Sequence, residues 1–196
     1  MQEVFYEETA ALQSVGAAKT KYYVIKTLSV VSYVIAIIWL IIGVTFFPLE
    51  GNVFLNILFA AVPFLLFLGS GIFFGKVKDR LYVDYDYTFV TGSIRFSRII
   101  KNAKRKSILV FDTQNIERIG RYGSSTFQKY VALPNKKQIY LTSNATPSDG
   151  KDFYYMTVNV KGQKYLLILE CSELFLSNIL RFTGRLVFED DFFNKK

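Results

Sequence analysis

Two apolar stretches decide the class of this protein: TLSVVSYVIAIIWLIIGVTFFPL at residues 27–49 and GNVFLNILFAAVPFLLFLGSGIFFG at residues 51–75. Neither stretch contains a charged side chain, and Glu50 alone separates them. At about 1.5 Å rise per residue, each is long enough to cross a hydrocarbon core about 30 Å thick as a helix. The residues typical of a turn between them are Pro48, Gly51 and Asn52. The sequence therefore predicts a transmembrane helical hairpin over residues 27–75.

The rest of the chain lies on either side of this hairpin. Residues 1–26 are polar to mildly amphipathic. We expect them to form a short cytoplasmic N-terminal tail, either as free chain or as a helix lying on the membrane. Residues 81–196 are enough for one small soluble domain with its own hydrophobic core.

The charges that flank the hairpin predict its orientation. Six basic residues do so: Lys19, Lys21 and Lys26 before it, and Lys76, Lys78 and Arg80 after it. The connecting turn has no Lys or Arg. The positive-inside rule then predicts a multi-pass protein of the plasma membrane with both termini in the cytoplasm. The first stretch starts too late and is too long for a signal peptide, so we expect an uncleaved anchor.

The net charge of +8 is unevenly distributed. Residues 1–80 hold 6 Lys and Arg against 5 Asp and Glu, whereas residues 81–196 hold 18 against 11, a net of +7. A basic domain favours nucleic acid, anionic lipid or an acidic partner. For a domain tethered beside a bilayer we expect anionic lipid as the partner, and no nucleic acid.

Small residues near the end of the second stretch predict close helix packing. Gly71 and Gly75 form a small-x-x-x-small pattern, which lets two helices approach each other. Two partners are open, the first helix of the same chain and a second copy in a homo-oligomer. Intrachain packing is the expectation, because hairpin helices pack together in any case. Pro63 inside the second helix predicts a kink.

From Leu81 the hydrophobic period changes from helix to strand. The pattern predicts strands at residues 81–89, 94–100, 107–111, 138–141, 153–160 and 164–170, with loops at 121–137 and 142–152. Thr91-Gly92 and Lys161-Gly162 are predicted hairpin turns, and residues 102–105 form another turn. A final helix is predicted after the capping residue Ser172 and before Gly184. Its predicted apolar face consists of Leu174, Phe175, Ile179 and Phe182.

Six or seven antiparallel strands closed by one C-terminal helix describe the pleckstrin-homology (PH) superfold. The predicted fold class is therefore an α+β membrane protein, in which a transmembrane helical hairpin precedes a PH-like antiparallel β-barrel or sandwich.

Two segments carry a resemblance to a known family. YDYTFVTGSIRFSRII at residues 85–100, followed by KRK at 104–106, resembles an uncharacterised family of bacterial two-helix membrane proteins, and so does GQKYLLILE at 162–170. The likeness covers most of the chain. It implies a membrane protein with a cytoplasmic PH-like domain, and it implies no activity and no functional residues.

Few residues suggest chemistry. Asp84 and Asp86 share one face of a strand, so they form either an acid–base or cation-binding pair, or an ion pair with Arg95 or another basic neighbour on the adjacent strand. Cys171 is the only cysteine and lies at a strand-to-helix junction, where we expect a buried structural thiol. The chain has no histidine. We expect no enzyme activity, no catalytic residues, no cofactor and no metal site.

The best functional signal is a basic run within residues 95–106, consisting of Arg95, Arg98, Lys101, Lys104, Arg105 and Lys106. Two readings are open. The run is a solvated hairpin that resists aggregation, or Lys101, Lys104, Arg105 and Lys106 bind anionic lipid together with Lys76, Lys78 and Arg80 at the bilayer surface.

The predicted function is a membrane-anchored binding or scaffolding module that faces the cytoplasm. The alternative is an accessory subunit of a membrane transporter or envelope-assembly complex, in which the hairpin contacts a membrane-protein partner. Polar side chains facing such a partner favour the alternative. The candidates are Ser29, Ser32, Asn52, Asn56 and Ser70.

Overall fold

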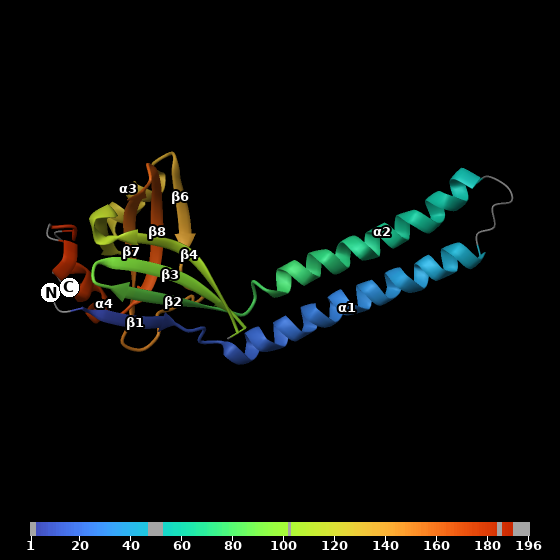
Figure 1. Cartoon of the computed structure of the whole chain (residues 1–196), viewed down its shortest axis with the longest axis horizontal. Coiled ribbons are helices and arrows are strands. Elements are labelled where there is room, and N and C mark those ends of the chain that lie inside the picture. Colours follow the sequence, from blue (N-terminus) through green and yellow to red (C-terminus); the bar gives the residue numbers. More distant parts are fainter. Residues whose placement is uncertain (1–2, 47–52, 102, 184–185, 190–196) are drawn as a thin grey trace. The chain divides into compact units, whose positions relative to one another are not determined.

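A computed structural model of the protein describes residues 3–46, 53–101, 103–183 and 186–189. The chain divides into two compact units, one containing residues 14–82 and the other the segments on either side of them. Figure 1 shows the helices of the first unit and the two sheets of the second. Several predicted features lie outside the described residues, namely the turn at Pro48, Glu50, Gly51 and Asn52, position 102 and the helix stop at Gly184.

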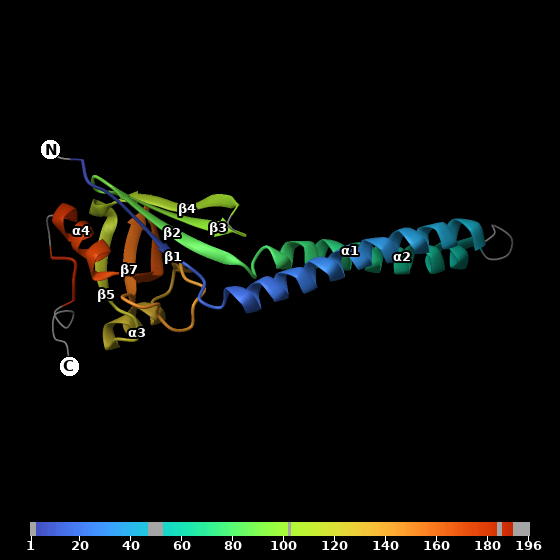
Figure 2. The same ribbon diagram turned by 90° about the horizontal axis from the view of Figure 1, so that it is seen from below.

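The hairpin unit consists of α1 (Val15–Phe46) and α2 (Val53–Lys78), which lie side by side in Figures 1 and 2. Both helices are long and apolar enough to cross a membrane. Large apolar side chains are exposed along both, with Ile37 58% and Leu66 68% exposed. Helix α1 starts at Val15 and not at Thr27, because the small and polar residues before Thr27 also favour helix.

Small residues allow the two helices to approach each other. Gly71 lies against the Tyr33 ring, and Gly75 lies against the Ser29 hydroxyl. The Ser29 hydroxyl donates a hydrogen bond to the Gly71 carbonyl at 2.8 Å. Both glycines of the predicted pattern therefore contact α1 of the same chain.

The second unit begins with sheet A, a set of four antiparallel strands in the order β1-β2-β3-β4. The strands are β1 (Phe5–Ala10), β2 (Val83–Val90), β3 (Ser93–Ile100) and β4 (Lys104–Asp112). In β1 and β2, Phe5 pairs with Val90 and Ala10 with Tyr85, and the two strands lie side by side in both views (Figures 1 and 2).

Strand β1 corrects the prediction of an N-terminal tail or membrane-surface helix. The pattern misses β1 because its buried positions include Glu8, so the usual apolar alternation is absent.

Sheet B contains β5 (Ile116–Arg121), β6 (Lys136–Tyr140), β7 (Asp152–Val160) and β8 (Gln163–Cys171), in the order β5-β7-β8-β6. Strand β6 runs parallel to β8, so the prediction of a purely antiparallel domain is wrong. Two short helices, η1 (Thr113–Asn115) and α3 (Ser125–Ala132), lie before and after β5. The sequence did not predict β5 or α3, and it treated residues 121–137 as irregular.

The two sheets face each other around one core that α4 (Glu173–Thr183) closes. Tyr87 of sheet A donates a hydrogen bond to the Leu141 carbonyl at 2.7 Å and accepts one from the Glu170 amide at 3.2 Å, so its hydroxyl links the sheets. Within the described residues no ladder joins sheet A to sheet B, and the domain is a sandwich and not a closed barrel. Leu174 is 57% exposed and does not belong to the buried face of α4, contrary to prediction.

The two predicted hairpin turns are present. Thr91 and Gly92 have φ values of 42° and 90°, and Lys161 and Gly162 have values of 53° and 80°. Two consecutive positive φ values match the twist of the flanking strands in a two-residue turn, and glycine adopts this conformation without strain.

Ser172 caps α4, as predicted, because its hydroxyl accepts a hydrogen bond from the Phe175 amide at 3.3 Å. Phe175 packs into the core from the first turn of this helix.

Candidate functional site

Two basic side chains lie opposite each other at one end of sheet A. Tyr85, Arg98 and Lys106 are partners in one row across β2, β3 and β4. Like charges directly opposite each other on neighbouring strands are destabilising. Neither Arg98 nor Lys106 forms an ion pair with a described carboxylate. An anion bound at this row would therefore reduce the repulsion between Arg98 and Lys106.

A cavity of about 300 Å³ adjoins this row, between the end of sheet A and β6. Tyr85, Arg98, Lys106, Ser107 and Tyr140 supply its polar groups, and no Asp or Glu among the described residues lines it. Burial raises the pKa of Tyr85, although the nearby charge of Arg98 and a hydrogen bond with Ser143 oppose the shift. The cavity thus presents two cations and neutral hydroxyls, which is the donor set that suits a phosphate or another oxyanion.

The β3–β4 turn continues the same end of the sheet. Lys104 and Lys106 are exposed, and Lys101 adopts a positive φ of 53° at the turn. Ile100, immediately before the turn, pairs with Val83, the residue at which the chain enters β2 after the hairpin. The basic turn therefore adjoins the point where the second connection to the hairpin is attached.

Arg105 has a different environment from its neighbours in the basic run. Its guanidinium lies 2.6 Å from Asp86 and 3.1 Å from Glu7. Burial raises the pKa of Asp86, while the charge of Arg105 opposes that shift. Arg105 lies opposite Ile99 of β3 and reaches diagonally across that strand to Asp86 of β2, which is the partner of Ser97. The ion-pair interpretation of the Asp86 carboxylate is thus correct, with Arg105 in place of Arg95 and one strand further away than expected.

Lys76, Lys78 and Arg80 belong to the hairpin unit, at the C-terminal end of α2. Two of these cations lie in the last helical turn, where they complement the partial negative charge of the helix end. Their participation in lipid binding stays a prediction.

A buried carboxylate organises the loop beside the hairpin connections. Glu170, at the end of β8, is fully buried. It accepts hydrogen bonds from the Thr142 hydroxyl, from the Asn144 amide group at 2.9 Å, and from the Ser148 amide and hydroxyl at 2.9 and 2.6 Å. Burial alone would raise the pKa of Glu170, but the hydrogen bonds from these residues outweigh it and lower the pKa. The loop between β6 and β7 is therefore fixed around an ionised carboxylate.

This loop holds the chain where it leaves β1. Asn144 donates to the Ala11 carbonyl at 2.8 Å and accepts from the Gln13 amide at 2.9 Å. The chain is also held where it enters β2, since the Ser143 hydroxyl donates to the Val83 carbonyl at 3.0 Å. Asp84 links the two segments directly by accepting from the Leu12 amide at 2.8 Å. These four residues, Glu170, Asn144, Ser143 and Asp84, hold the two chain segments that lead to and from the hairpin. We call them the root clamp.

A comparison with family models identifies the chain. Residues 13–189 match the model described as "Bacterial PH-like domain (DUF6106)". The chain belongs to this family of bacterial PH-like domains. The resemblance predicted from the sequence is confirmed. The root clamp belongs to this PH-like domain, and so does the basic end of sheet A, which consists of Arg98, Lys106 and the β3–β4 turn. PH-like domains generally serve for binding or scaffolding. No curated protein and no solved structure matches the chain.

The N-terminal end of α4 in this PH-like domain is a structural site. The Glu8 carboxylate of β1 accepts from the Ser172 amide at 2.9 Å and from its hydroxyl at 2.8 Å, and it pairs with Lys151 at 3.1 Å. Cys171 is fully buried beside it, and burial raises the pKa of its thiol well above the usual value. A buried, protonated thiol agrees with the structural role expected for Cys171.

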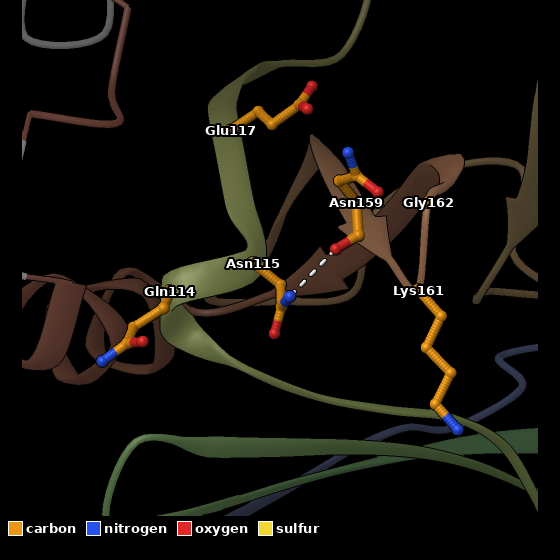
Figure 3. A pocket seen from close by; sticks show the side chains of 6 residues that line it. All are labelled: Gln114, Asn115, Glu117, Asn159, Lys161 and Gly162. Atoms are coloured by element: carbon orange, nitrogen blue, oxygen red, sulfur yellow. Dashed lines mark hydrogen bonds between the residues drawn. The ribbon is translucent and has the colours of Figure 1, made fainter.

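A second, shallower cavity of about 440 Å³ lies where η1 meets the β7–β8 turn (Figure 3). Asn115 donates a hydrogen bond to the Asn159 carbonyl at 2.9 Å there. Figure 3 shows the Lys161 side chain extending away from Glu117. Amide groups thus dominate this cavity, without a cluster of cations. Among the described residues no group of three metal-ligating side chains occurs.

Proposed function

We propose that this PH-like domain is a membrane-anchored binding or scaffolding module, and that the basic end of sheet A contacts anionic lipid headgroups on the cytoplasmic face of the plasma membrane. The observation that carries the proposal is the Arg98–Lys106 pair, which faces a cavity lined by hydroxyl groups and, in the part of the chain that the structure describes, by no carboxylate. Lys104 extends the same positive surface. Arg105 contributes less, because Asp86 and Glu7 neutralise it.

The pairing of β1 with β2 supports a two-pass anchor. These strands lie in one sheet, although α1 and α2 separate them in the sequence. Strands of one sheet must be on the same side of a membrane, so the segment between them crosses it an even number of times. Two long apolar helices with exposed side chains favour two crossings. The flanking basic residues favour a cytoplasmic domain.

The same sheet supports contact with the bilayer surface. The chain enters β2 at Val83, and Ile100, which precedes the β3–β4 turn, is the partner of Val83, so this turn adjoins the start of β2 and is the part of sheet A that we propose for the contact. Lys101, Lys104 and Lys106 are the basic residues of this turn and its flanks that we propose for contact with the headgroups. Each basic residue near an anionic surface contributes about 1 kcal/mol.

The rival proposal of an accessory subunit has less support. The hydroxyls of Ser29, Ser32 and Ser70 donate to carbonyls within the hairpin, at 2.8, 2.8 and 2.9 Å. They are therefore not available as donors to a partner helix. Purification of the chain from native membranes in mild detergent separates the two proposals, since a stoichiometric protein partner supports the subunit.

The lipid proposal is tested with the full chain in neutral detergent. Short-chain phosphatidylglycerol is titrated against short-chain phosphatidylcholine, with thermal unfolding and chemical shifts as the readouts. We expect binding of the anionic lipid alone, weakened by salt. Arg98→Gln with Lys106→Gln should lower the affinity by up to about thirtyfold, the equivalent of about 2 kcal/mol. The control, Lys129→Gln with Lys161→Gln, removes the same charge from α3 and the β7–β8 turn. An equal loss of affinity in both double variants would show that binding depends on the overall charge of the protein and not on the basic end, and would contradict the proposal.

A further inference from the structure

A second, smaller core covers part of the outer face of sheet B. Phe127 of α3 packs against Tyr155, Leu166 and Ile168. The ring centroid of Tyr155 lies 5.5 Å from that of Phe127 and 5.7 Å from that of Tyr130. Helix α3 starts at its cap Ser124, whose hydroxyl accepts from the Phe127 amide at 3.1 Å. The helix therefore holds its aromatic side chains firmly on the sheet.

The segment between α3 and β6 covers a cavity beside this core. After α3 the chain passes through Leu133 and Pro134 before it enters β6. Between these residues and the sheet lies a cavity of about 220 Å³, which Tyr130 and Leu166 also line. This volume is below that of the usual drug-sized site, which begins at about 300 Å³. The cavity suits a small molecule with an apolar body.

The polar groups of the cavity carry a net positive charge. Lys136 and Lys164 are partners in the parallel pairing of β6 with β8, and both line the cavity. The Lys136 ammonium is buried and has no hydrogen-bond partner among the described residues. Burial lowers the pKa of Lys136. A buried charge without a partner is costly, so an anion that enters the cavity gains the hydrogen bonds that the protein does not supply.

The charge balance selects the kind of anion. Glu117 is the one described carboxylate in the lining, and it lies within 4 Å of neither lysine. Two ammonium groups and one carboxylate leave a single positive charge. A singly charged anion neutralises this charge, whereas a doubly charged phosphate would leave an excess negative charge in the cavity.

We propose that this cavity binds a small monocarboxylate with an aromatic or branched aliphatic body. Its carboxylate accepts from the Lys136 ammonium, and its body lies among Tyr130, Leu133, Pro134 and Leu166. The site lies on the outer face of sheet B and shares no lining residue with the cavity at the basic end. It is therefore independent of lipid binding.

Phenylacetate is a suitable probe, and phenylacetamide is its neutral control with nearly the same shape. Each is titrated into the full chain in neutral detergent, with ligand-observed NMR as the readout. We expect saturable binding of phenylacetate and binding of the amide that is weaker by about tenfold or more, because hydrogen bonds between charged groups are strong. Equal affinities for the acid and the amide, or no saturable binding of the acid, would overturn the proposal.

Substitutions then locate the site. Lys136→Met should weaken phenylacetate binding by about tenfold or more, and the free variant should unfold at no lower temperature than wild type, since a buried unpaired charge is removed. Lys137→Met is the matched control, because Lys137 is the next residue of β6, is exposed and does not line the cavity. A second variant, Leu133→Gln, changes the half-exposed apolar wall and should also weaken binding. Wild-type affinity in Lys136→Met or in Leu133→Gln would refute this placement.

Discussion

Removal of β1 tests the most unexpected feature of the fold. A fragment that starts at Arg80 retains every strand that the sequence pattern predicts, and the sequence alone therefore predicts that it folds. The structure predicts the opposite, because the fragment loses the edge strand of sheet A and the Glu8 carboxylate, which holds the capping residue Ser172 of α4 in place. The comparison is a linked domain, in which residues 3–13 are joined to Val83 by a short Gly-Ser segment. This linkage is feasible because Ala10 and Tyr85 are direct partners.

The size of the expected loss in stability follows from the interactions of Glu8. Its two hydrogen bonds to Ser172 contribute about 1.5–3 kcal/mol each, as bonds to a charged group. Both would be lost, together with the ion pair to Lys151 and the burial of Ala10. The Glu8 contribution of about 3–6 kcal/mol is comparable with the whole stability of a small domain, about 5–15 kcal/mol. The Arg80 fragment should therefore be unfolded or aggregated at 25 °C.

Urea unfolding followed by circular dichroism measures the difference. The linked domain should unfold in one cooperative transition, and the Arg80 fragment should show none. Glu8→Ala in the linked domain should reproduce most of the loss, while Glu7→Ala, at the neighbouring exposed position, should cost under about 1 kcal/mol as a surface ion pair. If the Arg80 fragment and the linked domain unfolded at the same urea concentration, the role assigned to β1 would be wrong.

Three further predictions concern the root clamp, the orientation and the closing helix. Glu170→Gln should lower the free energy of unfolding by about 2–4 kcal/mol at neutral pH, because one oxygen is replaced by a donor that faces other donors. Since hydrogen bonds lower the pKa of Glu170, its contribution is present above the usual carboxyl value of 4.5 and is lost as pH falls below it, so wild type and variant should converge in acid. In a Cys171→Ala background, an impermeant thiol reagent should label cysteine at position 52 and spare cysteine at position 149 in intact cells, and the reverse pattern would invert the topology. Deletion of the chain after Cys171 should expose the core beneath α4 and cause aggregation, and a soluble, cooperative product would contradict the role of that helix.

Patterns with a strong local signal were predicted correctly. Positive-φ turns such as Thr91-Gly92 and Lys161-Gly162 depend on residues adjacent in sequence, and so does the cap at Ser172. The apolar helices are recognisable because their composition is uniform. The family resemblance rested on two contiguous segments and is confirmed.

The features that the sequence does not predict, such as strand β1 and the direction of β6, depend on distant partners. Strand β1 has Glu8 at a buried position, and that residue is explained only by Ser172 and Lys151. Strand β6 is short and obtains its direction from β8, which no local pattern encodes. Glu170 and Asn144 of the root clamp are far apart in sequence, and only the fold makes them neighbours. The local signal for this site is an acidic residue, Glu170, at the end of an apolar run.

The sequence identifies the basic run within residues 95–106 but does not separate its members. Strand register places Arg98 beside Lys106 on one face and sends Arg105 to the other face, where Asp86 and Glu7 neutralise it. Sequence alone does not reveal this division because a bulge between Phe96 and Ser97 shifts the register of the two strands.

The position of α1 and α2 between β1 and β2 has a consequence for biosynthesis. The ribosome releases β1 first, and its partner follows only after both apolar helices have been made. If the hairpin spans a membrane as we propose, sheet A is completed only after both helices have been made and inserted. A chain with only one of the two helices inserted would leave β1 and β2 on opposite sides of the bilayer, and Glu8 would then be unable to reach Ser172. Folding of the PH-like domain would then act as a checkpoint on membrane insertion, and proteases would remove the chains that fail it.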